Sequence, residues 1–104
     1  MHLILGFGAT GASYLRYLNK KNISTLIMDS RVRPSGLSEF DNLNHDNLLL
    51  GKFDVGVLDR VNTILVSPGI DYANEVLEEG RKKGTKILTD IEIFVKEAKS
   101  KKIF

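Results

Sequence analysis

The chain has 104 residues, of which 42% are hydrophobic and 27% charged, and its formal net charge at pH 7 is +2. This length fits one domain with its own core, and the composition is that of a globular rather than a disordered chain. The net charge is too small for the basic stripe of a nucleic-acid-binding surface, and the lack of cysteine excludes disulfides and thiolate chemistry.

The first predicted element is a strand over residues 2–5, an apolar run that ends at Gly6. The run has no positive flank and is far shorter than the roughly 20 apolar residues that span a bilayer, so we expect it to be neither a signal peptide nor a membrane anchor. A helix is predicted over residues 10–20, because Gly11, Leu15 and Leu18 share one face at helical spacing.

The second predicted strand covers residues 23–29 and ends in an acidic side chain, Asp29. Pro, Gly, Ser and Asn mark residues 30–45 as a loop with room for one short helical turn. Residues 47–51 form a short third strand, and a weak helical pattern follows over residues 53–58.

A fourth buried strand is predicted over residues 63–66, followed by a sharp turn at Pro68 and Gly69. Asp71 is expected to cap the next helix, and Gly84 to end it. The inward face of that helix has the helical spacing of Ala73, Val76, Leu77 and Gly80. Residues 85–88 are predicted to form a fifth strand.

Residues 88–94 carry the start of a further helix. Thr89 and Glu92 form a capping box, and Leu88 and Ile93 are placed for a hydrophobic staple. The lysines of residues 96–102 fit a last turn, which we expect to be a solvated face rather than a binding patch.

Strands that alternate with helices predict parallel β-α-β units. We therefore expect an α/β fold, a Rossmann-like five-stranded parallel sheet with strand order 3-2-1-4-5, flanked by helices. This order places the first and fourth strands side by side, and ligands bind outside their carboxyl ends.

The glycines at positions 6, 8 and 11 have the G-x-G-x-x-G spacing of a turn that approaches a phosphate group. Asp29, at the end of the second strand, could accept a hydrogen bond from a ribose hydroxyl or a base N–H, or could simply cap its loop. Arg31 could meet a 2′-phosphate or flank a planar base.

The sequence carries no evident catalytic apparatus. It has no G-x-x-x-x-G-K-[ST] loop, and His2 and His45 alone build neither a zinc site nor a nucleophilic triad. We expect no catalytic residue and no metal site in this chain.

Four segments in register resemble the N-terminal domain of the Mur ligases that add D-glutamate to UDP-N-acetylmuramoyl-L-alanine. They are GFGATGAS (6–13), MDSR (28–31), SPGI (67–70) and DIEIF (90–94). The resemblance implies that residues 1–104 are a single UDP-binding domain. It also implies that the central ATP-binding domain and the C-terminal D-glutamate domain lie outside this chain, which alone should be inactive.

The same resemblance assigns the substrate contacts. Ala9 and Thr10 correspond to the uridine-contacting turn, residues 29–31 to the base-and-ribose edge, and Gly69 to the phosphate side. Many family members have Thr at the position of Ser30, which keeps the hydroxyl. The predicted UDP-binding residues are Gly8, Ala9, Thr10, Gly11, Asp29, Ser30, Arg31, Ser67 and Gly69.

We expect this domain to bind no cofactor, with ATP and Mg²⁺ belonging to the full-length enzyme, and to act as a monomer in the bacterial cytoplasm without contact to membrane or nucleic acid. One alternative is an NAD-binding regulatory module of the kind that gates potassium transport. Such a module would share the glycine turn and Asp29 but does not account for the SPGI turn. The other alternative is a structural domain whose glycines serve packing only.

Overall fold

The computed structural model describes residues 1–89. They form a sheet of five parallel strands in the order β3-β2-β1-β4-β5. The strands are β1 (His2–Leu5), β2 (Thr25–Asp29), β3 (Leu48–Leu50), β4 (Thr63–Val66) and β5 (Lys86–Leu88). The predicted α/β fold and strand order are confirmed.

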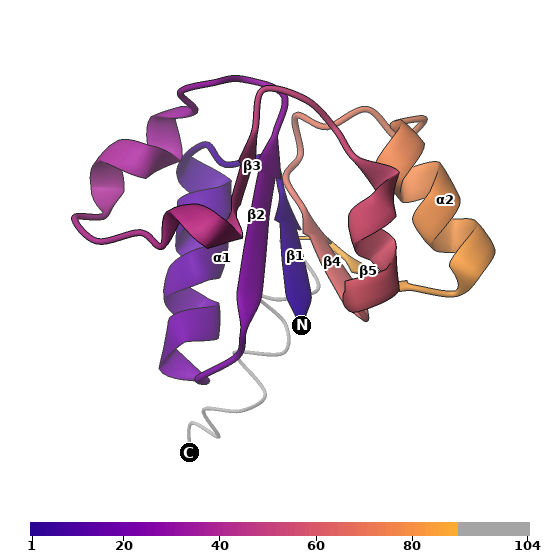
Figure 1. Ribbon diagram of the computed structural model, residues 1–104, viewed down its shortest axis with the longest axis horizontal. Helices are drawn as coiled ribbons and strands as arrows, with labels where there is room; N and C mark the ends of the chain where they lie inside the picture. The colour runs from indigo at the N-terminus through magenta and orange to yellow at the C-terminus, as the bar shows by residue number, and fades with distance from the viewer. Residues whose placement is uncertain (90–104) are drawn as a thin grey trace, which may run out of the picture.

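Helices cover both faces of the sheet (Figure 1). The α-helices are α1 (Ala9–Lys20) and α2 (Glu75–Lys83), and the 3₁₀ helices are η1 (Ser35–Glu39), η2 (His45–Asn47) and η3 (Val55–Arg60). Helices α1 and η1 pack on one face, and η3 and α2 pack on the other. The domain therefore has three layers, with the sheet in the middle.

Alternating side chains of the central strands fill both interfaces. Leu3 and Leu5 of β1 belong to the cluster under η3 and α2, whereas Ile4 belongs to the cluster under α1. All three are fully buried. Burying such a side chain contributes about 1.5–3 kcal/mol to the free energy of unfolding. Strand β1 is therefore firmly held in the core and supports the turn that follows it at Gly6.

Helix α2 begins later than predicted, and its cap is Asn74, not Asp71. The Asn74 side chain accepts a hydrogen bond of 2.8 Å from the Val76 amide. Asp71 instead accepts one of 2.8 Å from the amide of Ala73, in a separate turn that precedes the helix. Both residue types favour caps and turns, and only the chain path after Gly69 decides which one starts the helix.

Several other boundaries also differ from the prediction, and two of these differences have a clear local cause. Strand β2 starts at Thr25 because the Ile23 amide donates to Leu18 O (3.0 Å) and closes the end of α1, with Asn22 at a φ of 57°. The helical pattern at 53–58 is the 3₁₀ helix η3, whose start is capped by Asp54.

The predicted helix start that needs Glu92 and Ile93, and the lysines of residues 96–102, lie outside the described residues. Across residues 1–89, no helix combines the length and hydropathy needed to cross a bilayer.

The carboxyl ends of the central strands meet at one edge, the upper edge in Figure 1. Register pairs Leu5 with Met28 on one side and with Val66 on the other. The residues that follow these three strands are therefore neighbours in space, although they are far apart in the sequence.

Candidate functional site

The turn between β1 and α1 supplies the first wall of the site. Gly6 has a φ of 91° and donates its amide to Met28 O at 2.8 Å, which holds the turn against β2. Helix α1 then begins with Gly8 as its N-cap, and within residues 1–89 no side chain caps its first turn and no acid lies in it. Its first N–H groups are therefore available to an acceptor from outside the helix.

Gly11 has a different role from the other glycines of this turn. A Cβ at Gly11 would lie 2.3 Å from Gly6 O, so only glycine allows α1 to approach the turn this closely. Gly11 is buried and does not line the pocket described below. The G-x-G-x-x-G pattern thus combines pocket-lining and packing positions.

The end of β2 supplies the second wall through the buried carboxylate of Asp29. Its Oδ2 accepts from the Phe7 amide (2.7 Å) and from Arg31 Nη2 (2.7 Å). Its Oδ1 accepts from the amide of Arg31 (2.9 Å) and from Arg31 Nε (3.0 Å). The Asp29 side chain is 4% exposed and that of Arg31 58%, so the pair links the interior to the surface.

These contacts fix the charge of the pair. Burial by itself raises the pKa of Asp29, but the hydrogen bonds from the Arg31 side chain and from the Phe7 and Arg31 amides, together with the Arg31 charge, outweigh it and lower that pKa below its ordinary value of 3.8. The same ion pair raises the pKa of Arg31. At neutral pH the carboxylate and the guanidinium are both charged.

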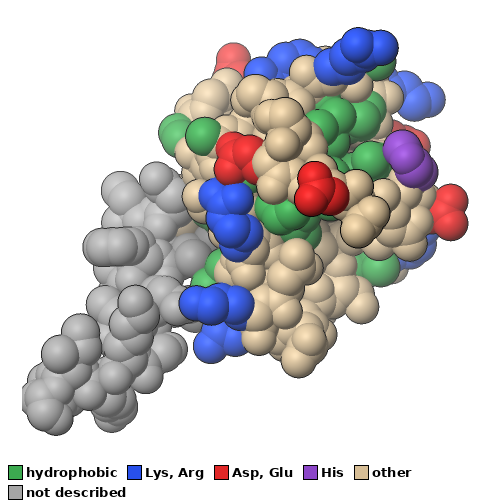
Figure 2. Space-filling model, turned by 90° about the vertical axis from the view of Figure 1, so that its left-hand side faces the viewer, with side chains coloured by type: hydrophobic (Ala, Val, Ile, Leu, Met, Phe, Trp, Pro, Cys, Tyr) green, Lys and Arg blue, Asp and Glu red, His purple; other side chains and the backbone are tan. Residues whose placement is uncertain are grey.

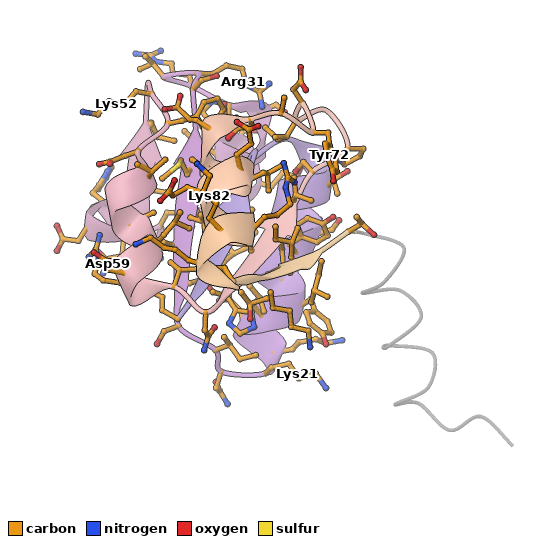
Figure 3. The ribbon with its side chains drawn as sticks, turned by 90° about the vertical axis from the view of Figure 1, so that its right-hand side faces the viewer. Lys21, Arg31, Lys52, Asp59, Tyr72 and Lys82 are labelled. Atoms are coloured by element: carbon orange, nitrogen blue, oxygen red, sulfur yellow. The ribbon has the colours of Figure 1, made fainter. Side chains whose placement is uncertain are left out.

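The segment after Arg31 packs directly on the glycine turn. The Gly36 amide donates to Phe7 O at 2.8 Å, and a Cβ at Gly36 would lie 2.6 Å from that oxygen. A Cβ at Gly8 would lie 3.9 Å from Arg31 Nη2, so the guanidinium stands next to the start of α1. Arg31 and Lys52 lie at the same upper end of the molecule in Figure 3, where Lys and Arg side chains also gather in Figure 2.

The SPGI turn after β4 supplies the third wall. The Ser67 hydroxyl donates to Gly6 O at 2.8 Å and the Ser67 amide to Leu5 O at 3.0 Å, which fastens this turn to the end of β1. The amide of Ile70 closes the turn onto Ser67 O at 3.1 Å. A Cβ at Gly69 would meet nothing within 4 Å, so this glycine faces open space.

The three walls enclose a solvent-open pocket of about 360 Å³. Of the predicted binding residues, Gly11 alone does not line it, and the other eight all do. The pocket also includes Gly6, Pro68 and Ile70, which the sequence argument quoted in its motifs but did not assign to the ligand. The lining residues are Gly6, Gly8, Ala9, Thr10, Asp29, Ser30, Arg31, Ser67, Pro68, Gly69 and Ile70.

The pocket is rich in hydrogen-bond donors. The free amides of α1, the Ser30 hydroxyl and the outer guanidinium nitrogens of Arg31 suit an anion or a carbonyl-rich ring. Among residues 1–89, no group of three or more His, Cys, Asp or Glu could hold a metal ion.

Residues 1–89 match the family model described as "Mur ligase MurD-like, N-terminal domain". The whole chain is similar to UDP-N-acetylmuramoylalanine–D-glutamate ligases from Shewanella oneidensis, with 35% identity over 102 residues, and Nitrosococcus oceani, with 35% over 99. The corresponding ligase of Legionella pneumophila strain Paris is 36% identical over 98 residues. These alignments cover 97%, 94% and 93% of this chain but only 23%, 22% and 22% of the relatives, so the chain spans less than a quarter of their length.

Proposed function

This chain belongs to the Mur ligase MurD-like N-terminal domain family, and on that premise we propose that it binds the UDP moiety of UDP-N-acetylmuramoyl-L-alanine. The observation that carries the proposal is the pocket. Segments 6–10, 29–31 and 67–70, which follow three different strands, line one hollow at the carboxyl edge of the sheet. That edge is where open α/β sheets bind nucleotides.

The donors of the pocket match the acceptors of a uridine diphosphate. Uracil has two ring carbonyl groups, and we assign them to the Ser30 hydroxyl and the Arg31 guanidinium, since both residues line the β2 side of the pocket. Ala9 and Thr10 stand at the uncapped start of α1, and Gly69 leaves room for the phosphates on the β4 side.

The role of this domain in the whole protein is positioning. In the proposed reaction, ATP phosphorylates the substrate carboxylate, and the amine of D-glutamate attacks the acyl phosphate to extend the peptidoglycan precursor. ATP, Mg²⁺ and the catalytic residues are assigned to parts of the protein outside this chain. By gripping the UDP end, this domain uses binding energy remote from the reacting carbon. We place this activity in the bacterial cytoplasm.

Thermal denaturation of the chain with UDP, UMP, NAD, NADP or ATP tests the proposal. We expect stabilisation by the uridine nucleotides, with a dissociation constant in the high micromolar range or weaker, because the other domains contribute no contacts. Ligand at about 100 times its Kd should add roughly 2.7 kcal/mol to the free energy of unfolding. Lys82→Gln is the control for nonspecific charge effects, because this exposed side chain of α2 lies outside the pocket lining, and the variant should be stabilised by the same nucleotides as wild type.

The rival function is dinucleotide binding, which the glycine turn and the acid at the end of β2 would also serve. Stabilisation by NAD without stabilisation by UDP would overturn our proposal in favour of the NAD-binding module. No stabilisation by any of the five nucleotides would favour a structural domain.

A further inference from the structure

The carboxylate of Asp29 is fully engaged by hydrogen bonds from within the domain. Each of its oxygens accepts two hydrogen bonds, one from a backbone amide and one from the Arg31 guanidinium. A carboxylate has about four acceptor positions, two on each oxygen. A uracil N3–H or a ribose hydroxyl could therefore bind Asp29 only by displacing one of these donors.

The contacts that occupy Asp29 also set the shape of the pocket on two sides. Nε and Nη2 of Arg31 grip the carboxylate as a fork, which fixes the guanidinium plane and leaves the Nη1 donors directed away from the pair. The Phe7 amide, in the middle of the glycine turn, binds the same carboxylate at 2.7 Å. One buried side chain thus connects the β2 side of the pocket to the turn that begins α1.

We infer that Asp29 is a positioning residue, which acts on the nucleotide through Arg31 and the glycine turn without contacting the ligand. This inference rests on the proposed function for the identity of the nucleotide. Direct recognition falls to Arg31 and Ser30, whose side chains are exposed at the rim. In dinucleotide-binding sites, an acid at the end of a strand accepts hydrogen bonds from the ribose hydroxyl groups. Asp29 does not serve that role, because its acceptor positions are already used.

A double-mutant cycle with two ligands tests the inference. Calorimetric titration would compare UDP with N3-methyl-UDP, which lacks the N3–H donor, in wild type, Asp29→Asn, Arg31→Ala and the double variant. We expect Asp29→Asn to weaken both ligands by the same factor, about tenfold, as for the loss of one charge-assisted hydrogen bond. In the Arg31→Ala background, Asp29→Asn should lower the affinity by less than about twofold, because Asp29 acts on the ligand mostly through Arg31.

Two outcomes would overturn the inference. In the first, Asp29→Asn lowers the affinity for UDP by a factor at least about five times larger than for N3-methyl-UDP, which would show direct contact with the base. The other is a loss of the same size with and without Arg31. Asp59→Asn is the matched control, because Asp59 is also ion-paired but lies outside the pocket, and it should leave both affinities unchanged.

A ligand-free measurement separates this inference from the proposed function. In an NMR titration with acid, the Phe7 amide proton and the Arg31 Nε proton should shift together with the Asp29 carboxyl carbon, since all three belong to one set of hydrogen bonds. Independent titration of these nuclei would contradict the positioning role even if UDP binds. Failure of UDP to bind wild type, with the joint titration intact, would instead overturn the proposed function and leave the Asp29 contacts established.

Discussion

The two α-helices of the domain begin in opposite ways. At the start of α2, the Asn74 side chain caps the first turn, and Glu75 and Glu78 lie within that turn. The start of α1 has Gly8 as its N-cap and, among the described residues, neither a side-chain cap nor an acid. Side chains of α2 therefore bind its terminal N–H groups and complement its dipole. Among residues 1–89, no side chain does either at the start of α1.

Under the proposed function, this difference separates a structural helix from a binding helix. The first residues of α1 line the pocket, whereas those of α2 do not. An uncapped start costs stability in the free domain, and a bound anion is the group that would recover it. The following predictions change one of the two helices, or the ion pair at the end of β2, and ask whether stability or binding responds.

The largest expected effect is on the packing of α1. Gly11→Ala should lower the free energy of unfolding by about 2–3 kcal/mol, because the new Cβ would lie 2.3 Å from Gly6 O. Helix propensity alone predicts the opposite sign, a gain of about 1 kcal/mol. Urea denaturation decides between them. Gly69→Ala, where a Cβ meets nothing within 4 Å, should change stability by less than about 0.5 kcal/mol.

The next effect is on binding alone. Ala9→Asp gives α1 the acid that α2 already has, and should leave the stability of the free domain unchanged or raised by about 0.3–1 kcal/mol. The affinity for UDP should fall by about tenfold or more, since the carboxylate repels the diphosphate across the pocket. Calorimetry measures both ligand affinity and melting, and Ala9→Asn is the neutral control. Undiminished UDP binding would contradict the proposed position of UDP in the pocket.

A smaller effect is expected at the start of α2. Asn74→Ala removes the acceptor of the Val76 amide and should cost about 1 kcal/mol of stability. Asn74→Ser should retain most of that stability, because its hydroxyl can cap the same amide. UDP affinity should stay at the wild-type value in both variants. A loss of affinity that parallels the loss of stability would mean that α2 also supports the pocket.

The smallest effect near neutral pH concerns Asp29, whose pKa is lowered in the folded domain against the opposing effect of its burial. A lowered pKa means that its stabilising contribution is complete above the ordinary value of 3.8 and is lost as pH falls through the folded value. Stability measured by denaturation should therefore be insensitive to this group from pH 5 upward, in round terms about one unit above the unfolded pKa, and decline below it. In Arg31→Ala the decline attributable to Asp29 should be shallower.

Most of the fold could be predicted because its strands are short apolar runs bounded by glycine, proline or polar residues. Strands β1 and β4 were located to the residue, since each is buried and ends at a turn signal. The predicted start of α2 was wrong because Asp and Asn are equally good helix caps, so the sequence does not distinguish Asp71 from Asn74. Which of them is used depends on the path of the chain after the SPGI turn, and local preferences do not encode it.

The pocket was predictable for a different reason. Its walls come from three motifs, and the topology of the sheet brings their strand ends together. The contacts within the walls were not predictable. The Phe7 amide lies 22 positions from Asp29 in the sequence, and the Arg31 contact depends on a single side-chain rotamer. Neither contact leaves a periodic signal in the sequence. Likewise, Gly11 has the same place in the motif whether it faces a ligand or a carbonyl oxygen.

Two contacts fasten the first part of the long connection from β2 to β3 to the glycine turn: the Gly36 amide on Phe7 O, and the Phe40 ring stacked on the Phe7 ring. Residues 30–40 are braced against the glycine turn by these contacts, so a sensor placed there would disturb the pocket. Asp41 and Asn42 are exposed and lie beyond that brace. A fluorescent reporter inserted between them would lie outside the pocket lining, and the braced segment before it would connect the pocket to the reporter.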